Sequence, residues 1–199
     1  MKILVCVSHV PDTTSKINFI NDDTAFDKNG VQFVINPNDE FGLTRAVWFQ
    51  QKQQAEVTVI TVGDSNCEPT LRKCLAIGAN KAFRVDMNPT DGFQVAQQLS
   101  AHCKLENYDL IIAGRESIDY NGAMVPGMVS ALLGYNFVTN CMALEVKGNI
   151  VKACREIDGG IEYVSCQLPL VIGAQKGLVE EKDLIIPNMR GIMQARKKS

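Results

Sequence analysis

The amino-acid sequence predicts an α/β protein in which a mostly parallel sheet is covered by helices on both faces and is followed by an antiparallel hairpin meander. The first observation is that short apolar strand segments alternate four times with amphipathic helical segments between residues 2 and 134. The second is a change of rhythm after residue 135, where alternating segments are separated by glycine-bearing turns. No internal repeat or low-complexity linker interrupts the chain, so residues 1–199 are interpreted as one domain.

The composition is that of an ordinary globular protein. Of 199 residues, 46% are hydrophobic and 21% are charged, and the net charge of -2 gives no reason to expect nucleic acid as a partner. No apolar run reaches the roughly 20 residues that a membrane span requires. Met1 leads directly into an apolar strand without the features of a signal peptide, so we expect a cytoplasmic protein without membrane insertion.

The residue types that usually carry catalysis or metal binding form no recognisable pattern. The seven cysteines include no C-x-x-C pair and lie mostly among apolar neighbours, which predicts small buried residues in a reducing compartment. The G-x-G-x-x-G, P-loop, G-x-S-x-G and H-E-x-x-H motifs do not occur in the sequence. No metal site and no catalytic set are therefore predicted.

The first segments are predicted to be a strand, a long loop and a helix. Residues 2–7 are apolar throughout, as a central strand is. Residues 8–35 form a loop in which 16–20 could pair with 31–35, and a loop of this length usually has a function such as covering a ligand. Asn36-Pro37-Asn38-Asp39 then opens a helix, with Asn38 or Asp39 as its cap.

Strands and helices alternate from there. The expected elements are a strand at 56–62, a helix at 68–77 ended by Gly78, a strand at 81–85 and a helix at 92–105. In a parallel sheet with right-handed crossovers, the loops that follow the strands lie along one edge. That edge should therefore carry the crevice of the protein.

The stretch from Tyr108 to Gly134 is the most informative part of this pattern. It contains a buried strand at 110–113, a polar loop with Gly122, and a helix from Ala123 that Gly134 ends. The free N–H groups at the start of such a helix can bind an anion such as phosphate. The alternative is an ordinary strand-to-helix turn.

The C-terminal third is predicted to contain the meander and an extended tail. Segments at 142–147, 150–156 and 161–167 alternate, and together they place the meander at 141–168. An apolar strand follows at 168–172. From Lys176 onward the chain is charged, and we interpret it as an extended surface segment that lies on a partner.

These residues together resemble the beta subunit of electron transfer flavoprotein. The most specific match is Ala153-Cys154-Arg155-Glu156-Ile157-Asp158-Gly159-Gly160-Ile161-Glu162, followed by the Leu168-Pro169-Leu170 strand. Asn36-Pro37-x-Asp39-Glu40, Gly114-Arg115-x-Ser117-Ile118-Asp119 and Ile186-Pro187-Asn188 match in the family's order. The resemblance covers essentially the whole chain.

The resemblance implies a Rossmann-like three-layer sandwich of the adenine nucleotide-binding type that works in a heterodimer. The beta subunit holds a buried nucleotide, commonly AMP, and borders the redox FAD of the alpha subunit. It is an electron carrier rather than an enzyme. Donors would be acyl-CoA dehydrogenases or other flavin dehydrogenases, and the acceptor would be an ETF-quinone oxidoreductase-like protein.

The resemblance also assigns two sets of residues in this chain. The residues carried over to the nucleotide site are Cys6 (through its backbone), Asn36, Pro37, Asn38, Asp39, Val62, Gly114, Arg115, Ser117, Asp119, Asn121, Gly122, Ala123, Met124 and Val125. The docking segment that grips the dehydrogenase maps onto residues 176–193, and its core residues are Leu184, Ile185, Ile186, Pro187 and Asn188.

Several departures from the family leave alternatives open. Ala123-Met124-Val125 replaces the usual Asn-Gln-Thr, which leaves backbone N–H groups as the main phosphate donors and is closer to bifurcating relatives in which a second FAD replaces AMP. Thr13 stands where many relatives have a tyrosine beside the flavin, and Met189-Arg190-Gly191 is similar to an insertion. Relatives usually continue past a basic Lys-Lys pair as an arm around the alpha subunit, whereas this sequence ends at Ser199.

Other functions stay possible at this point. Leu184–Ile186 could be a short strand tucked against the domain instead of a docking anchor. The chain could also be a stand-alone nucleotide-binding sensor, although such a module would need neither the meander nor the basic tail. A hydrolase of adenine nucleotides would need a motif such as S-G-G-x-D-S, which is absent from the sequence.

Overall fold

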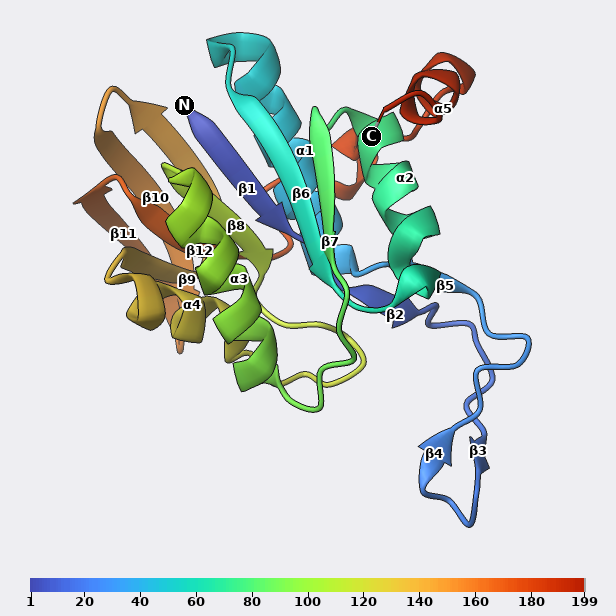
Figure 1. Cartoon of the computed structure of the whole chain (residues 1–199). Helices are drawn as coiled ribbons and strands as arrows, with labels where there is room; N and C mark the ends of the chain where they lie inside the picture. The colour runs from blue at the N-terminus through green and yellow to red at the C-terminus, as the bar shows by residue number, and fades with distance from the viewer. Residues whose placement is uncertain (199) are drawn as a thin grey trace.

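A computed structural model, which describes residues 1–198, shows an eight-stranded sheet at the centre of the protein (Figure 1). Its strand order is β11-β10-β9-β12-β8-β1-β6-β7. The six strands from β9 to β7 are parallel, whereas β10 and β11 are antiparallel additions at one edge. The strands are β1 (Lys2–Cys6), β6 (Glu56–Val62), β7 (Lys81–Val85), β8 (Leu110–Gly114), β9 (Asn136–Lys147), β10 (Ile150–Ile157), β11 (Gly160–Gln167) and β12 (Leu170–Ala174).

Helices cover both faces of this sheet, which confirms the three-layer α/β sandwich. The helices among residues 1–198 are α1 (Pro37–Gln53), α2 (Glu68–Ile77), α3 (Gly92–Glu106), α4 (Val125–Leu133) and α5 (Met189–Ala195). Helices α3 and α4 lie on one face, and α1 and α2 lie on the other (Figure 1). No helix in this part of the chain is long and apolar enough to cross a membrane.

The central strands divide their side chains between two apolar clusters. In β1, Ile3 and Val5 join the cluster under α1 and α2, whereas Leu4 and Cys6 join the cluster under α3 and α4. This period-two division is what a strand buried on both faces requires. All seven cysteines have free thiols, and six are buried, as their apolar neighbours in the sequence indicate.

The loop at residues 8–35 folds differently from the expected pairing of 16–20 with 31–35. Strand β2 (His9–Pro11) pairs with β5 (Phe33–Ile35), and β3 (Phe19–Ile20) pairs with β4 (Ala25–Phe26). The β3–β4 turn is made by residues 21–23, which all have left-handed φ angles. The pairing prediction was therefore wrong, and the β3–β4 hairpin projects from the body of the protein (Figure 1).

The meander prediction is confirmed, with one extension. Strand β9 begins at Asn136 rather than near Met142 because its first half pairs in parallel with β12, before its second half pairs with β10. Asp158 and Gly159 form the two-residue turn between β10 and β11, where the φ of Gly159 is +81°. Asp-Gly is a preferred pair for such a turn.

The C-terminal segment is not wholly extended, which corrects the sequence interpretation. After residues 184–188 the chain forms α5, whose N-cap Asn188 accepts a hydrogen bond from the N–H of Gly191 at 2.8 Å. Helix α5 packs on α2, and the Arg72 guanidinium donates to the carbonyl oxygens of Ala195 and Lys198 at 2.8 and 2.5 Å. This packing returns the basic end of the chain to the domain.

Candidate functional site

The candidate site lies where the order of the parallel strands reverses. The chain moves from β1 to β6 and β7 on one side, then crosses to β8 on the other side of β1. In open α/β sheets, ligands bind outside the carboxyl ends of the strands at such a reversal. Residues 6–8 at the end of β1 and 114–118 at the end of β8 therefore border the expected crevice.

Asp39 joins these two turns directly. Its side chain is 3% exposed, and its Oδ2 accepts a hydrogen bond from the N–H of Ser8 at 2.8 Å. Its Oδ1 accepts a second bond from the N–H of Gly114 at 2.6 Å. A Cβ on Gly114 would lie 2.8 Å from Asn38 Cβ, 2.9 Å from Asn36 Nδ2 and closer still to Asp39 Oδ1, so only glycine allows this approach.

Opposing effects act on the protonation of Asp39. Burial raises the pKa of its carboxyl group from 3.8 to about 7. The N–H donors of Ser8 and Gly114 act in the other direction because they favour the ionised form, and the nearby Asp119 disfavours it. The carboxyl group therefore changes charge close to neutral pH.

The amides of Asn36 and Asn38 tie the same turn to α1. Asn36 is fully buried, donates from Nδ2 to the carbonyl oxygen of Glu116 at 2.9 Å, and accepts from the N–H of Ile118 at 3.2 Å. Asn38 donates to the same carbonyl at 3.1 Å. The N-cap of α1 is Asn36, and no side chain caps the helix, so the expectation that Asn38 or Asp39 does so was wrong.

The predicted phosphate-facing turn is exposed at the start of α4. Ala123 has a left-handed φ of 50°, so α4 begins at Val125 rather than at Ala123. Met124 and Val125 lie beside the start of α3, where they would contact a Cβ on Gly92. Asp119, Asn121 and Gly122 are also exposed, which leaves this part of the loop open to a ligand.

The remaining predicted residues occupy the ends of neighbouring strands. Cys6 is buried at the end of β1, and burial raises the pKa of its thiol well above its usual value. Val62 at the end of β6 and Val125 pack against the same apolar cluster as Cys6. His9 hydrogen-bonds Thr70 through Nδ1 at 2.8 Å and stacks on Phe33, so it has a structural partner rather than a catalytic one.

Arg115 belongs to a polar network that the sequence did not reveal. Its guanidinium forms an ion pair with Glu116 at 2.6 Å, and its Nη1 lies 3.5 Å from Gln175 Oε1. Gln175 is buried and donates to Glu156 Oε2 at 2.7 Å. The network borders a hollow of about 510 Å³ beside the crevice, lined by Asn38, Arg115, Met142, Glu156, Gln175, Lys176, Gly177 and Glu180.

This network gives a physical account of part of the family signature, by which we mean the segment at residues 153–162 that carries the resemblance most specifically. Glu156 reaches Gln175, and the preceding Arg155 pairs across the strands with Glu162 at 2.6 Å. The signature residues therefore hold the meander together and connect it to the turn after β8. Position in the sheet, rather than local sequence, brings these residues together.

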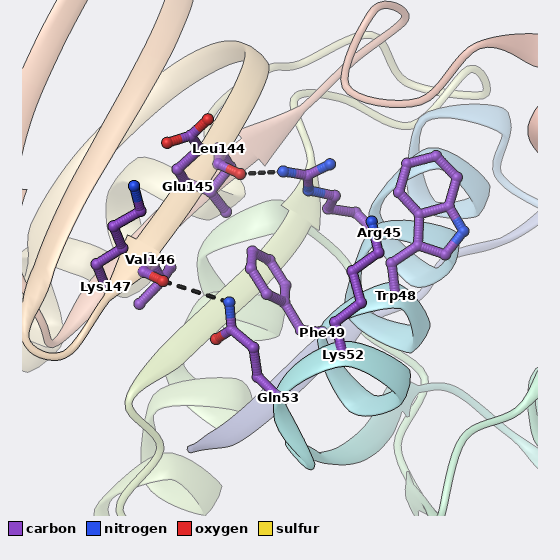
Figure 2. A pocket seen from close by; sticks show the side chains of 9 residues that line it. All are labelled: Arg45, Trp48, Phe49, Lys52, Gln53, Leu144, Glu145, Val146 and Lys147. Carbon is purple, nitrogen blue, oxygen red and sulfur yellow. Dashed lines mark hydrogen bonds between the residues drawn. The ribbon is translucent and has the colours of Figure 1, made fainter.

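A second hollow lies between α1 and β9, away from the crevice (Figure 2). The ladder between β9 and β12 ends at Cys141, so the edge of β9 is open beyond it. Arg45 donates to the carbonyl oxygen of Leu144, and Gln53 donates to that of Val146 at 3.3 Å. These two side chains satisfy carbonyl groups that no strand reaches, which is a structural role.

The predicted docking segment has one exposed apolar residue at its centre. Ile186 is 84% exposed, whereas Ile185 packs against the core and its N–H donates to Thr44 at 3.4 Å. Met189 and Met193 of α5 are also exposed. The triplet is thus divided, with Ile185 turned toward the domain and Ile186 turned away from it.

Comparisons with known proteins identify the family of this chain. The family model described as "Electron transfer flavoprotein domain" matches residues 23–199. "Electron transfer flavoprotein subunit beta" of Bacillus subtilis (strain 168) is 31% identical over 202 residues, covering 100% of this chain and 77% of the relative.

Two further relatives carry the same name. That of Syntrophomonas wolfei is 34% identical over 200 residues, covering 100% of this chain and 77% of the relative. That of Homo sapiens is 31% identical over 204 residues, covering 100% of this chain and 79% of the relative. The chain therefore belongs to the family of electron transfer flavoprotein beta subunits.

Proposed function

We propose that this chain works as the beta subunit of a heterodimeric electron transfer flavoprotein that binds AMP. In the heterodimer it borders the FAD of an alpha subunit and is an electron carrier rather than an enzyme. Acyl-CoA dehydrogenases or other flavin dehydrogenases would supply the electrons, and an ETF-quinone oxidoreductase-like protein or another acceptor would receive them. The cytoplasmic location expected from the sequence stays a prediction.

One observation carries the nucleotide part of this proposal. Residues 36–39 and the turn at 114–118 meet at the reversal of strand order, where Asp39 and Asn36 connect them. These are positions at which the family places its nucleotide. The same edge carries the exposed loop and the start of α4, so the residues converge on one crevice.

The donors in this crevice fit a small nucleotide held mainly by backbone groups. The side chains of Asn36, Asn38 and Asp39 contact other parts of the protein, and the Arg115 guanidinium is paired with Glu116. Ala123, Met124 and Val125 offer no side-chain donor. The first N–H groups of α4 would therefore hold a phosphate, while Asp119 or Asn121 would meet the sugar.

The redox chemistry comes from FAD, which accepts and donates electrons when bound between the two subunits. This chain would border that flavin and present Ile186 to a dehydrogenase. A small interface with one apolar anchor suits a contact that must be specific and short-lived. The exposure of Ile186 beside Met189 and Met193 supports that position for the anchor.

A specific observation favours one alternative ligand. The turn at 123–125 lacks the usual Asn-Gln-Thr, as in bifurcating relatives that hold a second FAD in place of AMP. Identification of the released ligand separates the two: AMP supports the main proposal, and stoichiometric FAD from the isolated chain supports the alternative.

The decisive experiment is co-purification with the product of the neighbouring gene. A yellow heterodimer that releases AMP and one FAD when denatured supports the proposed function. A colourless monomer that binds ATP would identify a stand-alone sensor instead. Reduction of the heterodimer's flavin by an acyl-CoA dehydrogenase tests the role as an electron carrier.

A further inference from the structure

Asp39 is distinguished by the hydrogen bonds that its carboxylate accepts from the protein backbone. Its two carboxylate oxygens accept hydrogen bonds from backbone N–H groups at the carboxyl ends of adjacent parallel strands, β1 and β8. The chain reverses its strand order between these same two strands. The carboxylate therefore connects the two strand ends at which the crevice is expected.

We propose that Asp39 is a positioning residue, whose carboxylate fixes the turns after β1 and β8 relative to each other and so sets the shape of the crevice without touching the ligand. Only the identity of the ligand rests on the function proposed above. The role differs from that of a ligand-contacting residue, which is what the family resemblance alone would assign to this position.

The two bonds require a group that accepts on both oxygens. An asparagine at position 39 would turn an NH₂ group, which cannot accept, toward one of the two N–H donors. A protonated aspartic acid would present its hydroxyl oxygen there, which is a weaker acceptor than a carboxylate oxygen. One bond is therefore lost in the asparagine variant and weakened in the protonated acid, and the hold on one turn is loosened. The close approach of Gly114 to Asp39, Asn38 and Asn36 leaves little freedom to compensate.

The groups around Asp39 allow its protonation to be followed. The ionisable groups that act on it are Asp119 on the loop after β8, Cys6 on β1 and Cys74 on α2. Burial raises the pKa of both thiols, so they stay neutral at pH 6–8, whereas the pKa of Asp39 is raised to about 7. Lowering the pH through this range should therefore loosen one turn reversibly.

The chain also offers a matched control at the opposite edge of the same two strands. Asp109, just before β8, accepts a hydrogen bond from the N–H of Lys2 at the start of β1 at 2.7 Å. Asp109→Asn thus weakens a carboxylate link between the same two strands, far from the crevice. A merely structural role for Asp39 predicts that Asp39→Asn and Asp109→Asn behave alike.

The first measurement is a pH titration of the wild-type protein by amide NMR, which needs no variant and no ligand. The Ser8 and Gly114 amide protons should shift together between pH 6 and 8 with one apparent pKa. If the Asp39 carboxyl carbon titrates while both amides stay fixed, Asp39 does not control the two turns. Failure of Asp39→Asn to fold would not affect this measurement.

The second measurement is the affinity for adenosine, chosen because it has no phosphate group that titrates in this range. For Asp39→Asn we expect a loss of about ten- to hundredfold at pH 8, the worth of one hydrogen bond to a charged group. Wild-type affinity should fall toward the variant's value at pH 6, and Asp109→Asn should bind like wild type at both pH values. Equal affinities for wild type and Asp39→Asn would overturn the proposal.

The two measurements also separate this proposal from the proposed function. If wild type binds neither adenosine nor AMP while the Ser8 and Gly114 amides titrate together, the nucleotide function fails and the positioning by Asp39 stands. If adenosine binds with no dependence on Asp39 or on pH, the nucleotide function stands and the positioning role fails.

Discussion

Gly114→Ala tests the close approach on which the crevice depends. The added Cβ would lie 2.8 Å from Asn38 Cβ and 2.9 Å from Asn36 Nδ2. Carbon atoms in good contact are about 3.5–4.0 Å apart, so the turn after β8 must move by roughly 1 Å. The movement would also weaken the 2.6 Å bond from the Gly114 N–H to Asp39.

The expected cost is the sum of these two effects. Overpacking of a tight site costs about 1–3 kcal/mol, and a damaged hydrogen bond to a charged group costs about 1.5–3 kcal/mol. A total of roughly 2.5–6 kcal/mol corresponds to a fall in Tm of about 5–24 °C for a domain of this size. Thermal unfolding followed by circular dichroism would measure it.

Gly160→Ala is the matched control, because nothing lies within 4 Å of its added Cβ and its φ angle is not left-handed. It should leave the Tm unchanged or raise it slightly, since alanine restricts the unfolded chain. If both variants melted at the same temperature, the contacts at Gly114 would not be the constraint that we describe.

Three more predictions concern other parts of the chain. The pKa of Asp39 is about 7 in the folded protein and 3.8 in the unfolded chain, so its contribution to the unfolding free energy is fully present below about pH 4 and falls by about 4 kcal/mol as the pH rises through 7. Asp39→Asn should therefore flatten the fall in unfolding free energy between pH 5 and 7. A variant with the same slope as wild type would contradict this. Arg45→Ala removes the hydrogen bond to Leu144 and the contact with the Trp48 ring, so it should lower the unfolding free energy by about 1–3 kcal/mol and shift the fluorescence emission of the only tryptophan. If the emission and the urea midpoint were unchanged, Arg45 would not hold α1 against β9. Ile186→Ala should raise, by about ten- to hundredfold, the concentration of the heterodimer at which its flavin reduction by an acyl-CoA dehydrogenase is half-saturated, without changing the Tm. Ile17→Ala, also at an exposed position, is the control and should change neither value. A lower Tm with unchanged half-saturation would place Ile186 in the core.

The sequence predicted those parts of the fold that depend on local periodicity. A few neighbouring residues are enough to predict the apolar strand β8, the amphipathic helix α3 and the Asp158-Gly159 turn. The structure has each of them where it was expected. The pairing of residues 8–35 was missed because the sequence contains two turn-forming stretches there, Asn21-Asp22-Asp23 and Asn29-Gly30, and the expected pairing of 16–20 with 31–35 encloses both. The turn at 21–23 is the one that closes the β3–β4 hairpin, which is a two-stranded sheet separate from the main sheet.

For the candidate site, too, the sequence predicted what depends on local pattern and missed what depends on distant residues. The edge of the sheet could be predicted from strand order, because all the loops after parallel strands share it. The partners of Asp39 and Gln175 could not be predicted, since their bonds join residues 31 and 75 positions apart for Asp39 and 19 apart for Gln175. A polar residue in the first turn of a helix that packs on the sheet, such as Asp39, is the sequence feature that best indicates such bonds. A polar side chain that is buried there requires hydrogen-bond partners.

Ala123 provides the last prediction, because its conformation and its chemistry can be tested separately. Its φ of 50° is left-handed, which costs an alanine about 1–2 kcal/mol but is tolerated by asparagine and glycine. Ala123→Asn should therefore raise stability and add an amide beside the start of α4, so AMP affinity should rise while adenosine affinity stays constant. Ala123→Gly relieves the same strain without adding a donor, and should raise stability alone. If the two variants bound AMP equally, the turn would not face the phosphate, and the nucleotide would lie elsewhere along the edge.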